Sequence, residues 1–301
     1  MNRRLIIDTD IGTDVDDLWT LAMLPSLENV QLVAVTVVYG NTQVRAHLAS
    51  LALASMGINV PVYRGMESTM SGKAVMWAGY EGEGIDDLQN FAYATGDAVD
   101  VLIAQAKADP GSLDVVAIGP LTNIAMAIQR DAEFASNLGH LTVMGGEFSR
   151  EWPEHNFSAD AKATQIVLTS GIPTTIIPLN QTLRVMIGQS EVERIAEVHP
   201  IGQLMADQAH RFWEWLAKIV PLATGNSSAA HDPLALLALL RPEFFTFTAM
   251  ALELLGDDAF DGRVHGTPDE NSVIQVVTDL DIDAVREAFL NSLQVFSAPS
   301  E

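Results

Sequence analysis

The stretch Leu5-Ile6-Ile7-Asp8-Thr9-Asp10-Ile11-Gly12-Thr13-Asp14-Val15-Asp16-Asp17 decides how this chain is interpreted. A short apolar run leads directly into a loop that contains five aspartates within ten positions. Two unit charges about 4 Å apart repel each other by about 1 kcal/mol in water, and by several times that near a partly buried surface. Because the apolar lead-in argues against full solvation, the cluster needs a cation.

These aspartates also have an ordinary structural interpretation, because carboxylates favour helix N-termini. Asp14, Asp16 or Asp17 would then cap a helix that begins near Val15. This interpretation does not account for Asp8 and Asp10, which precede the glycine at the end of the apolar run. In open α/β sheets, ligands bind at the carboxyl ends of the strands. A cation site at a strand end is therefore the sharper interpretation.

The composition restricts the partners and the chemistry. With 16 basic and 39 acidic residues the net charge is −23, and phosphate binding needs a basic surface, so we expect no nucleic acid and no anionic membrane as partner. The absence of cysteine excludes thiol catalysis and cysteine-based metal sites. No apolar run approaches the roughly 18 residues of a membrane span. Only three apolar residues precede Asp8, too few for a signal peptide, and we expect a cytoplasmic protein.

Strand and helix patterns alternate along the chain, which predicts an α/β fold with a mostly parallel open sheet flanked by helices. Strands are expected in the opening apolar run and at residues 31–39, 60–63, 113–118, 141–144, 174–177, 249–255 and 273–278. Helices are expected near residues 15–24, 46–56, 97–108, 124–130, 161–169, 191–220, 233–240 and 281–296. The glycine-rich segment 68–96 is predicted to be a long loop, of the kind that serves as a lid or a binding loop. No repeat or linker divides the chain, so residues 1–301 are expected to form a single domain.

Polar side chains recur where the predicted strands end. They are Asp8 and Asp10, Asn41, the segment 119–123, Asn180 and, at a helix start, His231-Asp232. In a doubly wound sheet these positions converge on one rim. All the candidate ligands are oxygen atoms, which implies a hard cation, and Ca²⁺ accepts the irregular shell that loops supply more readily than Mg²⁺ does.

One enzyme class with an Asp-x-Asp at a strand end is the haloacid-dehalogenase-like phosphotransferases. In that resemblance Asp8 would be the nucleophile, Asp10 the acid/base and Mg²⁺ the metal. Residues 256–261, Gly-Asp-Asp-Ala-Phe-Asp, match the later Gly-Asp-x-x-x-Asp of that family. Against it, Gly12 stands where the first motif of that family carries threonine or valine.

A second resemblance accounts for more of the chain. Six motifs, in order from residue 5 to about residue 280, resemble those of the inosine-uridine-preferring nucleoside hydrolases. They are Asp8-Thr-Asp-Ile-Gly12 with Asp16-Asp17, Val37-Val-Tyr-Gly-Asn41, Gly119-Pro-Leu-Thr-Asn-Ile124, Met144-Gly-Gly146, Glu154-His-Asn156 and His231-Asp-Pro233. The resemblance implies a Rossmann-like nucleoside hydrolase fold, a homo-oligomer (dimer or tetramer), and hydrolysis of ribonucleosides to a free nucleobase and ribose.

Carried over to this chain, the resemblance implies a Ca²⁺ ion held by Asp10, Asp17, the backbone carbonyl of Ile118, and Asp232. Asp10 would also be the general base toward water, and His231 the donor toward the departing base. The chemistry is coherent, because breaking an N-glycosidic bond builds positive charge on the ribosyl ring and carboxylates stabilise that charge. A non-catalytic nucleoside or sugar binder is a third hypothesis, which the pair Asp10 and His231 disfavours.

The remaining members of the motifs receive binding or supporting roles from the same resemblance. Asp16, Asn41, Glu154 and Asn156 correspond to ligands of the ribose hydroxyls, and Asp8 to a supporting carboxylate.

The chain also departs from the common pattern of that family. Ile11 replaces the usual proline, and two extra residues follow Gly12, so Asp14 is a possible competitor for the metal. Asn180 stands where many members have aspartate, and Tyr80 lies in a loop where many have histidine. The aromatic candidates for stacking on a nucleobase are Trp77, Tyr80, Phe148 and Trp152.

Overall fold

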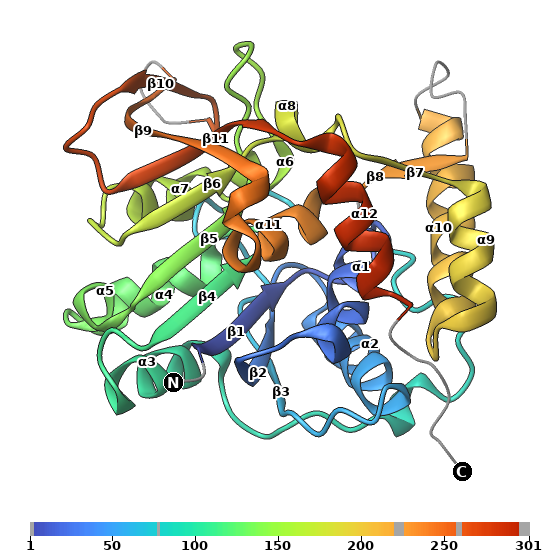
Figure 1. Cartoon of the computed structure of the whole chain (residues 1–301). Helices are drawn as coiled ribbons and strands as arrows, with labels where there is room; N and C mark the ends of the chain where they lie inside the picture. Colours follow the sequence, from blue (N-terminus) through green and yellow to red (C-terminus); the bar gives the residue numbers. More distant parts are fainter. Residues whose placement is uncertain (1–2, 77–78, 220–225, 257–260, 295–301) are drawn as a thin grey trace.

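A nine-stranded sheet forms the centre of the molecule in the computed structural model, which describes residues 3–76, 79–219, 226–256 and 261–294 (Figure 1). Its strands are β1 (Arg3–Thr9), β2 (Val30–Val37), β3 (Val62–Arg64), β4 (Leu113–Ala117), β5 (His140–Met144), β6 (Thr174–Ile177), β9 (Phe245–Leu254), β10 (Val264–Pro268) and β11 (Ile274–Leu280). A separate two-stranded antiparallel sheet pairs β7 (Met186–Gly188) with β8 (Ser227–Ala229).

The strand order, β10-β9-β11-β6-β5-β4-β1-β2-β3, contains one topological switch point. From β1 the chain moves to β2 and β3 on one side, and it then returns to place β4, β5 and β6 on the other side. All pairs from β3 to β11 are parallel, whereas β9 and β10 are antiparallel at the edge. The crevice between the carboxyl ends of β1 and β4 is therefore the expected ligand position.

Helices cover both faces of this sheet (Figure 1). They are α1 (Asp16–Ala22), α2 (Thr42–Ser55), α3 (Ala98–Ala108), α4 (Thr122–Arg130), α5 (Phe134–Asn137), α6 (His155–Ala159), α7 (Ala161–Leu168), α8 (Leu179–Thr182), α9 (Gln189–Val198), α10 (Gly202–Ile219), α11 (His231–Leu240) and α12 (Ile282–Ser292). Short 3-10 helices span Leu24–Ser26, Leu88–Asn90 and Pro242–Phe244.

The alternation of side chains along β1 explains how the two faces are filled. Leu5 and Ile7 belong to a core packed against α1, α2, α11 and α12, which α9 and α10 extend. Ile6 points to the opposite face and joins the core of α3, α4, α5 and α7. Strands that are buried on both faces read as continuous apolar runs, which is why β1, β2 and β4 were recognisable in the sequence.

The expected fold class is confirmed, and every expected strand is present. The strand expected at 249–255 begins four residues earlier, at Phe245, and the helical region 191–220 is divided between α9 and α10. Strand β10 was not expected, because its glycine and proline disfavour strands, but an edge strand tolerates both. Among the described residues, no helix is long and apolar enough to cross a membrane.

Candidate active site

The turn that follows β1 passes very close to the turn that follows β4. A Cβ atom added to Gly119 would lie 2.7 Å from Asp10 Oδ1 and 3.0 Å from the Asp10 nitrogen. Only glycine leaves room for this approach, since real Cβ atoms do not come so near to other heavy atoms. The two strand ends thus place Asp10 at the switch point of the sheet, as the sequence predicted for a strand-end site.

Three carboxylates from two helix starts gather beside it. Asp16 and Asp17 open α1 and Asp232 lies in the first turn of α11, and each offers an oxygen within 4.8 Å of the others. All three are buried, and the backbone N–H of Asp232 donates to Asp16 Oδ2 (3.4 Å). Neither carboxylate of α1 caps its own helix, because no side-chain cap hydrogen bond is present at the Val15 N-cap among the described residues.

Burial makes this cluster electrostatically costly. Desolvation raises the pKa of Asp10, Asp16, Asp17 and Asp232, and repulsion among these carboxylates raises the pKa of the last three further. Thr9 Oγ1 donates to Asp17 Oδ1 and offsets part of the cost. A divalent cation would offset far more, and a donor set made only of oxygens suits a hard cation such as Ca²⁺ or Mg²⁺. The residues present therefore fit a metal site.

The predicted ligands Asp17 and Asp232 belong to this three-carboxylate group, whereas Asp10 lies next to it. The charge of Asp10 raises the pKa of Asp17 and Asp232, so the three carboxylates lie close enough to interact. The carbonyl oxygen of Ile118 accepts a hydrogen bond from Asn156 Nδ2 (3.1 Å), which uses one of its two lone pairs. Asp16 was expected on the sugar, and the structure brings it into the carboxylate group.

The predicted ribose ligands Glu154 and Asn41 are also helix caps. Glu154 caps α6 and its carboxylate accepts N–H hydrogen bonds from Gly146, Asn156 and Phe157 at 2.7–3.0 Å. Asn41 is exposed and caps α2, where its Oδ1 accepts from the backbone of residue 44. Asn156 donates its Nδ2 hydrogens to two backbone carbonyls, which fixes the orientation of its amide.

His231 is the first residue of α11 and is oriented by a hydroxyl. Its Nδ1 lies 2.6 Å from Thr182 Oγ1, on α8. Burial lowers the pKa of His231 to about 4, so the ring is neutral at pH 7. The sequence left both charge states open, and the structure favours the neutral one.

Asp8 lies on β1 and links this strand to β2 and to α4. It accepts hydrogen bonds from Thr36 Oγ1 and from Asn123 Nδ2 (2.7 Å), while Asn123 Oδ1 accepts from the backbone N–H of Met66 (2.9 Å). Burial raises the pKa of Asp8 to about 7, and its Oδ2 has no hydrogen-bond partner among the described residues. This geometry suits the supporting role that the sequence suggested.

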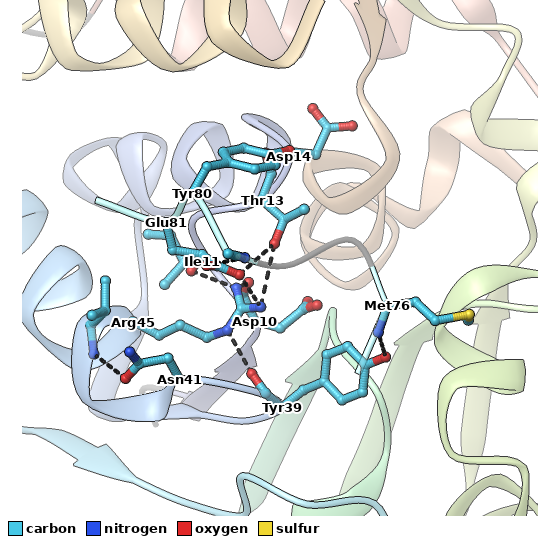
Figure 2. Close-up of polar contacts among 12 residues, drawn as sticks. Asp10, Ile11, Thr13, Asp14, Tyr39, Asn41, Arg45, Met76, Tyr80 and Glu81 are labelled. Atoms are coloured by element: carbon cyan, nitrogen blue, oxygen red, sulfur yellow. Dashed lines mark hydrogen bonds and ion pairs between the residues drawn. The ribbon is translucent and has the colours of Figure 1, made fainter. Parts of the chain in front are cut away.

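The long loop 68–96 reaches the same turn. Tyr80 Oη donates to the backbone oxygen of Thr13 (2.9 Å; Figure 2). The ring of Tyr80 lies 5.7 Å from that of Trp215. Asp14 Oδ1 accepts from the N–H of Val15 (2.6 Å), and burial raises the pKa of Asp14 to about 7. Trp77 lies outside the described residues.

The other aromatic candidates, Phe148 and Trp152, lie in the loop that follows β5. The backbone N–H of Phe148 donates to Asn180 Oδ1 (3.3 Å), which ties this loop to α8. Trp152 is 58% exposed, with the guanidinium of Arg150 over its ring at 5.6 Å.

Two residues at the site were not singled out from the sequence. Arg45 is fully buried and contacts the Asp10 turn; the available signal was a charged residue on the apolar face of a helix, between Thr42 and Ala49. Thr182, the last residue of α8, orients His231, but an isolated threonine in the sequence carries no signal of its own.

Fold and site together define a doubly wound α/β protein with a buried, oxygen-only acidic site at the carboxyl ends of its central strands. A family model described as inosine-uridine preferring nucleoside hydrolase matches residues 5–287. The chain belongs to this family, and the resemblance seen in its six motifs is confirmed. It is accordingly a hydrolase that acts on N-glycosyl bonds, with a nucleoside as its small-molecule substrate.

Curated relatives align over most of their length. The probable uridine nucleosidase 1 of Oryza sativa subsp. japonica is 29% identical over 260 residues, which cover 81% of this chain and 78% of the relative. The pyrimidine-specific ribonucleoside hydrolase RihB of Shigella flexneri is 27% identical over 265 residues, covering 84% and 83%. The phosphotransferase alternative is not favoured by these matches, and residues 257–260 of its second motif lie outside the described part of the chain.

Solved structures share the fold over nearly the whole chain. The plant nucleoside hydrolase PpNRh1 superposes with a TM-score of 0.86 at 22% identity, covering 98% of this chain and 100% of that chain. The purine-preferring ribonucleoside hydrolase from Gardnerella vaginalis has a TM-score of 0.85 at 24% identity, with 97% and 98% covered. The single-domain architecture with a mostly parallel sheet agrees with both structures.

Proposed function

We propose that this protein hydrolyses ribonucleosides to a free nucleobase and ribose, and that Ca²⁺ is its metal. The observation that carries the proposal is the buried carboxylate group of Asp16, Asp17 and Asp232 beside Asp10, at the switch point of the sheet. So many buried carboxylates repel one another unless a cation lies among them. Ligands that come from a turn and two helix starts suit the irregular coordination of Ca²⁺ better than the octahedron of Mg²⁺.

The ligands of the cation in this proposal are Asp10, Asp17, Asp232 and the carbonyl oxygen of Ile118. A bound divalent cation supplies positive charge that acidifies water and compensates the carboxylates. Asp10 takes the proton from the attacking water as the bond from oxygen to the anomeric carbon forms. The bond from that carbon to the base nitrogen breaks at the same time, and the nearby carboxylates stabilise the positive charge on the ribosyl ring.

The base leaves as an anion that accepts a hydrogen bond from His231 and takes its proton from solvent water. The Thr182 hydroxyl has two acceptors within reach, the carbonyl of Leu179 (3.2 Å) and Nδ1 of His231 (2.6 Å), and we assign its hydrogen to the shorter contact, which leaves the proton of the ring on Nε2. A neutral imidazole in this tautomer remains a donor at pH 7. We assign ribose contacts to Asp16, Asn41, Glu154 and Asn156. Glu154 and Asn41 also cap helices, and they would contact the ribose through the hydrogen-bonding capacity that their backbone contacts leave unused.

An assay of product formation tests the proposal. The metal-free protein, reloaded with Ca²⁺ or with Mg²⁺, is incubated with inosine, uridine, adenosine and cytidine, and free base and ribose are quantified by chromatography. We expect turnover that chelator abolishes and that Ca²⁺ restores, and Asp10→Ala should lower kcat by several orders of magnitude because it removes base and ligand together.

The panel includes purines and pyrimidines because the relatives named above differ in the bases for which they are named. Absence of turnover on every ribonucleoside would refute the enzymatic proposal. Binding of a ribonucleoside without turnover, measured by calorimetry, would instead support the non-catalytic binder.

We further propose a homo-oligomer, a dimer or tetramer, in the cytoplasm. The oligomer is suggested by the family, and a chain without cysteine, and so without disulfides, is compatible with a reducing compartment. Light scattering on the purified protein measures the oligomeric state directly.

A further inference from the structure

The guanidinium of Arg45 uses every hydrogen that it has. Nε donates to the carbonyl oxygen of Tyr39 (2.7 Å), and Nη1 donates to the carbonyls of Asp10 and Ile11. Nη2 donates to Thr13 Oγ1 (3.3 Å) and to Glu81 Oε1 (3.2 Å). An arginine has five N–H donors in a planar fork, and here all five have an acceptor.

Four of these five acceptors belong to the ends of β1 and β2 and to the turn that carries Asp10. Arg45 projects from α2 and lies across the carbonyls of residues 10 and 11 (Figure 2). The orientation of a carbonyl sets the orientation of the residue that carries it. Arg45 thereby fixes the backbone that carries the Asp10 carboxylate, whose charge raises the pKa of Asp17 and Asp232.

The fifth acceptor comes from the long loop. Glu81 forms a buried ion pair with Arg45, in which the two side chains are 0% and 5% exposed. The second oxygen of Glu81 accepts the N–H of Gly79 (2.8 Å), so the carboxylate also closes its own loop. Tyr80 lies between Gly79 and Glu81 in the sequence, and its hydroxyl donates to the carbonyl of Thr13. The loop is therefore joined to the Asp10 turn by Arg45, Glu81 and Tyr80 at once.

A cation beside a metal site is unusual, because its charge repels the metal. The negative charge of Glu81 balances that of Arg45 and removes this penalty. Buried ion pairs contribute little net stability compared with apolar packing, and are retained where they specify a geometry. Here the ion pair specifies how the turn that carries Asp10 packs against the loop 68–96.

We propose that Arg45 is a positioning residue of the active site, and that its ion pair with Glu81 couples the metal-binding turn to the loop segment Gly79–Gly82 that carries Tyr80. The inference rests on the proposed function. It predicts that the two partners act on different steps, since Arg45 acts through Asp10 on the metal and on turnover, whereas Glu81 acts through the loop on substrate binding.

The first test is Arg45→Lys, which keeps the charge but offers three donors on one nitrogen instead of a planar fork. The carbonyls of Asp10 and Ile11 then lose their fixed donors. At saturating Ca²⁺ we expect kcat to fall about 10- to 100-fold, because small displacements of a catalytic group cost that much. Calorimetric titration should give a Kd for Ca²⁺ at least about 10-fold weaker, with KM changed less than about 3-fold.

The second test is Glu81→Gln, which keeps the shape of the side chain. Glutamine has one acceptor oxygen where glutamate has two, so it cannot accept from both Arg45 and the N–H of Gly79, and the loss of either contact loosens segment 79–82. We expect the KM for the ribonucleoside to rise about 10-fold at saturating Ca²⁺, with kcat within about 3-fold of the wild type. The Kd for Ca²⁺ should weaken as well, because the charge of Arg45 is no longer balanced.

Arg286→Lys is the matched control, since the ion pair of Arg286 with Glu191 (2.5 Å) joins α12 to α9. Circular dichroism and thermal melting establish that all variants are folded. If both test variants melt at lower temperature but match the control in kcat, KM and Ca²⁺ affinity, the ion pair is only structural and the proposal is overturned.

If the wild type binds Ca²⁺ but hydrolyses no ribonucleoside, the proposed function fails. The calcium titration then decides alone, a weaker Kd in Arg45→Lys supporting the inference and an unchanged Kd overturning it. A wild type that binds no Ca²⁺ would overturn both.

Discussion

At the scale of single residues, the position of Asp10 depends on a neighbour that has no side chain. Gly119→Ala would place a Cβ atom 2.7 Å from Asp10 Oδ1, so the carboxylate or its turn must shift. We expect kcat for ribonucleoside hydrolysis to fall about 100-fold, which is the typical cost of displacing a catalytic group by about 1 Å. Steady-state kinetics on the folded variant measure this change.

Gly111→Ala is the control for this substitution. An added Cβ meets nothing within 4 Å, although the backbone φ of +79° strains any other residue. It should lower the melting temperature and leave kcat unchanged. Equal kcat in both alanine variants would contradict the role assigned to Gly119.

The residues of the site differ in how far their roles can be derived from sequence. The aspartates were recognisable because their residue type and density demand an explanation wherever they lie. The side chains of Glu154 and Asn41 were assigned to the sugar, and the structure adds a second role as helix caps, which depends on local backbone geometry. The sequence marks Arg45 as a charged residue on an apolar helix face but does not reveal its role, since its partner Glu81 lies 36 positions away in an irregular loop.

At the scale of elements, the break between α9 and α10 carries a pH-sensitive contact. His199 is buried, its Nε2 lies 3.1 Å from the carbonyl of Ala22 at the end of α1, and its Nδ1 accepts the N–H of Ile201. Burial lowers the pKa of His199. The neutral ring therefore stabilises the fold above the unfolded-state pKa of about 6.5, and this stability is lost as the pH falls through the lower folded-state pKa.

As the pH is lowered from about 7 to about 5, we expect the melting temperature of the wild type to fall relative to that of His199→Gln, because the variant has no charge to acquire. Thermal melting at fixed Ca²⁺ concentration measures the difference. His265→Gln, on the exposed edge strand β10, should behave as the wild type. A steeper pH dependence in His199→Gln than in the wild type would contradict this assignment.

The elements themselves were largely predictable, because central parallel strands are rich in β-branched residues and end at glycine or polar positions. The strands that escaped prediction, β7, β8 and β10, are three to five residues long and lie outside the central parallel part of the sheet. Their existence is decided by the partner strand rather than by their own composition. The same applies to the exact start of β9, which follows its pairing with β11.

At the scale of the whole molecule, the parallel topology brings residues of dispersed motifs to one edge of the sheet. Residues as far apart as Asp10 and Asp232 meet because β1 and β4 end at the same edge and because α11 begins beside α1. Within a chain of net charge −23, such a concentration of buried carboxylates is sustainable when a cation compensates it. The proposal assigns Asp10, Asp17, Asp232 and the carbonyl oxygen of Ile118 as the ligands of that cation.

Crystals of the metal-free protein soaked with Mn²⁺, an anomalous scatterer that accepts the same oxygen ligands, test this claim directly. We expect one strong anomalous peak at the carboxyl ends of β1 and β4, within bonding distance of Asp10, Asp17, Asp232 and the carbonyl oxygen of Ile118. No peak at that edge, or a peak that leaves Asp10 outside bonding distance, would contradict it.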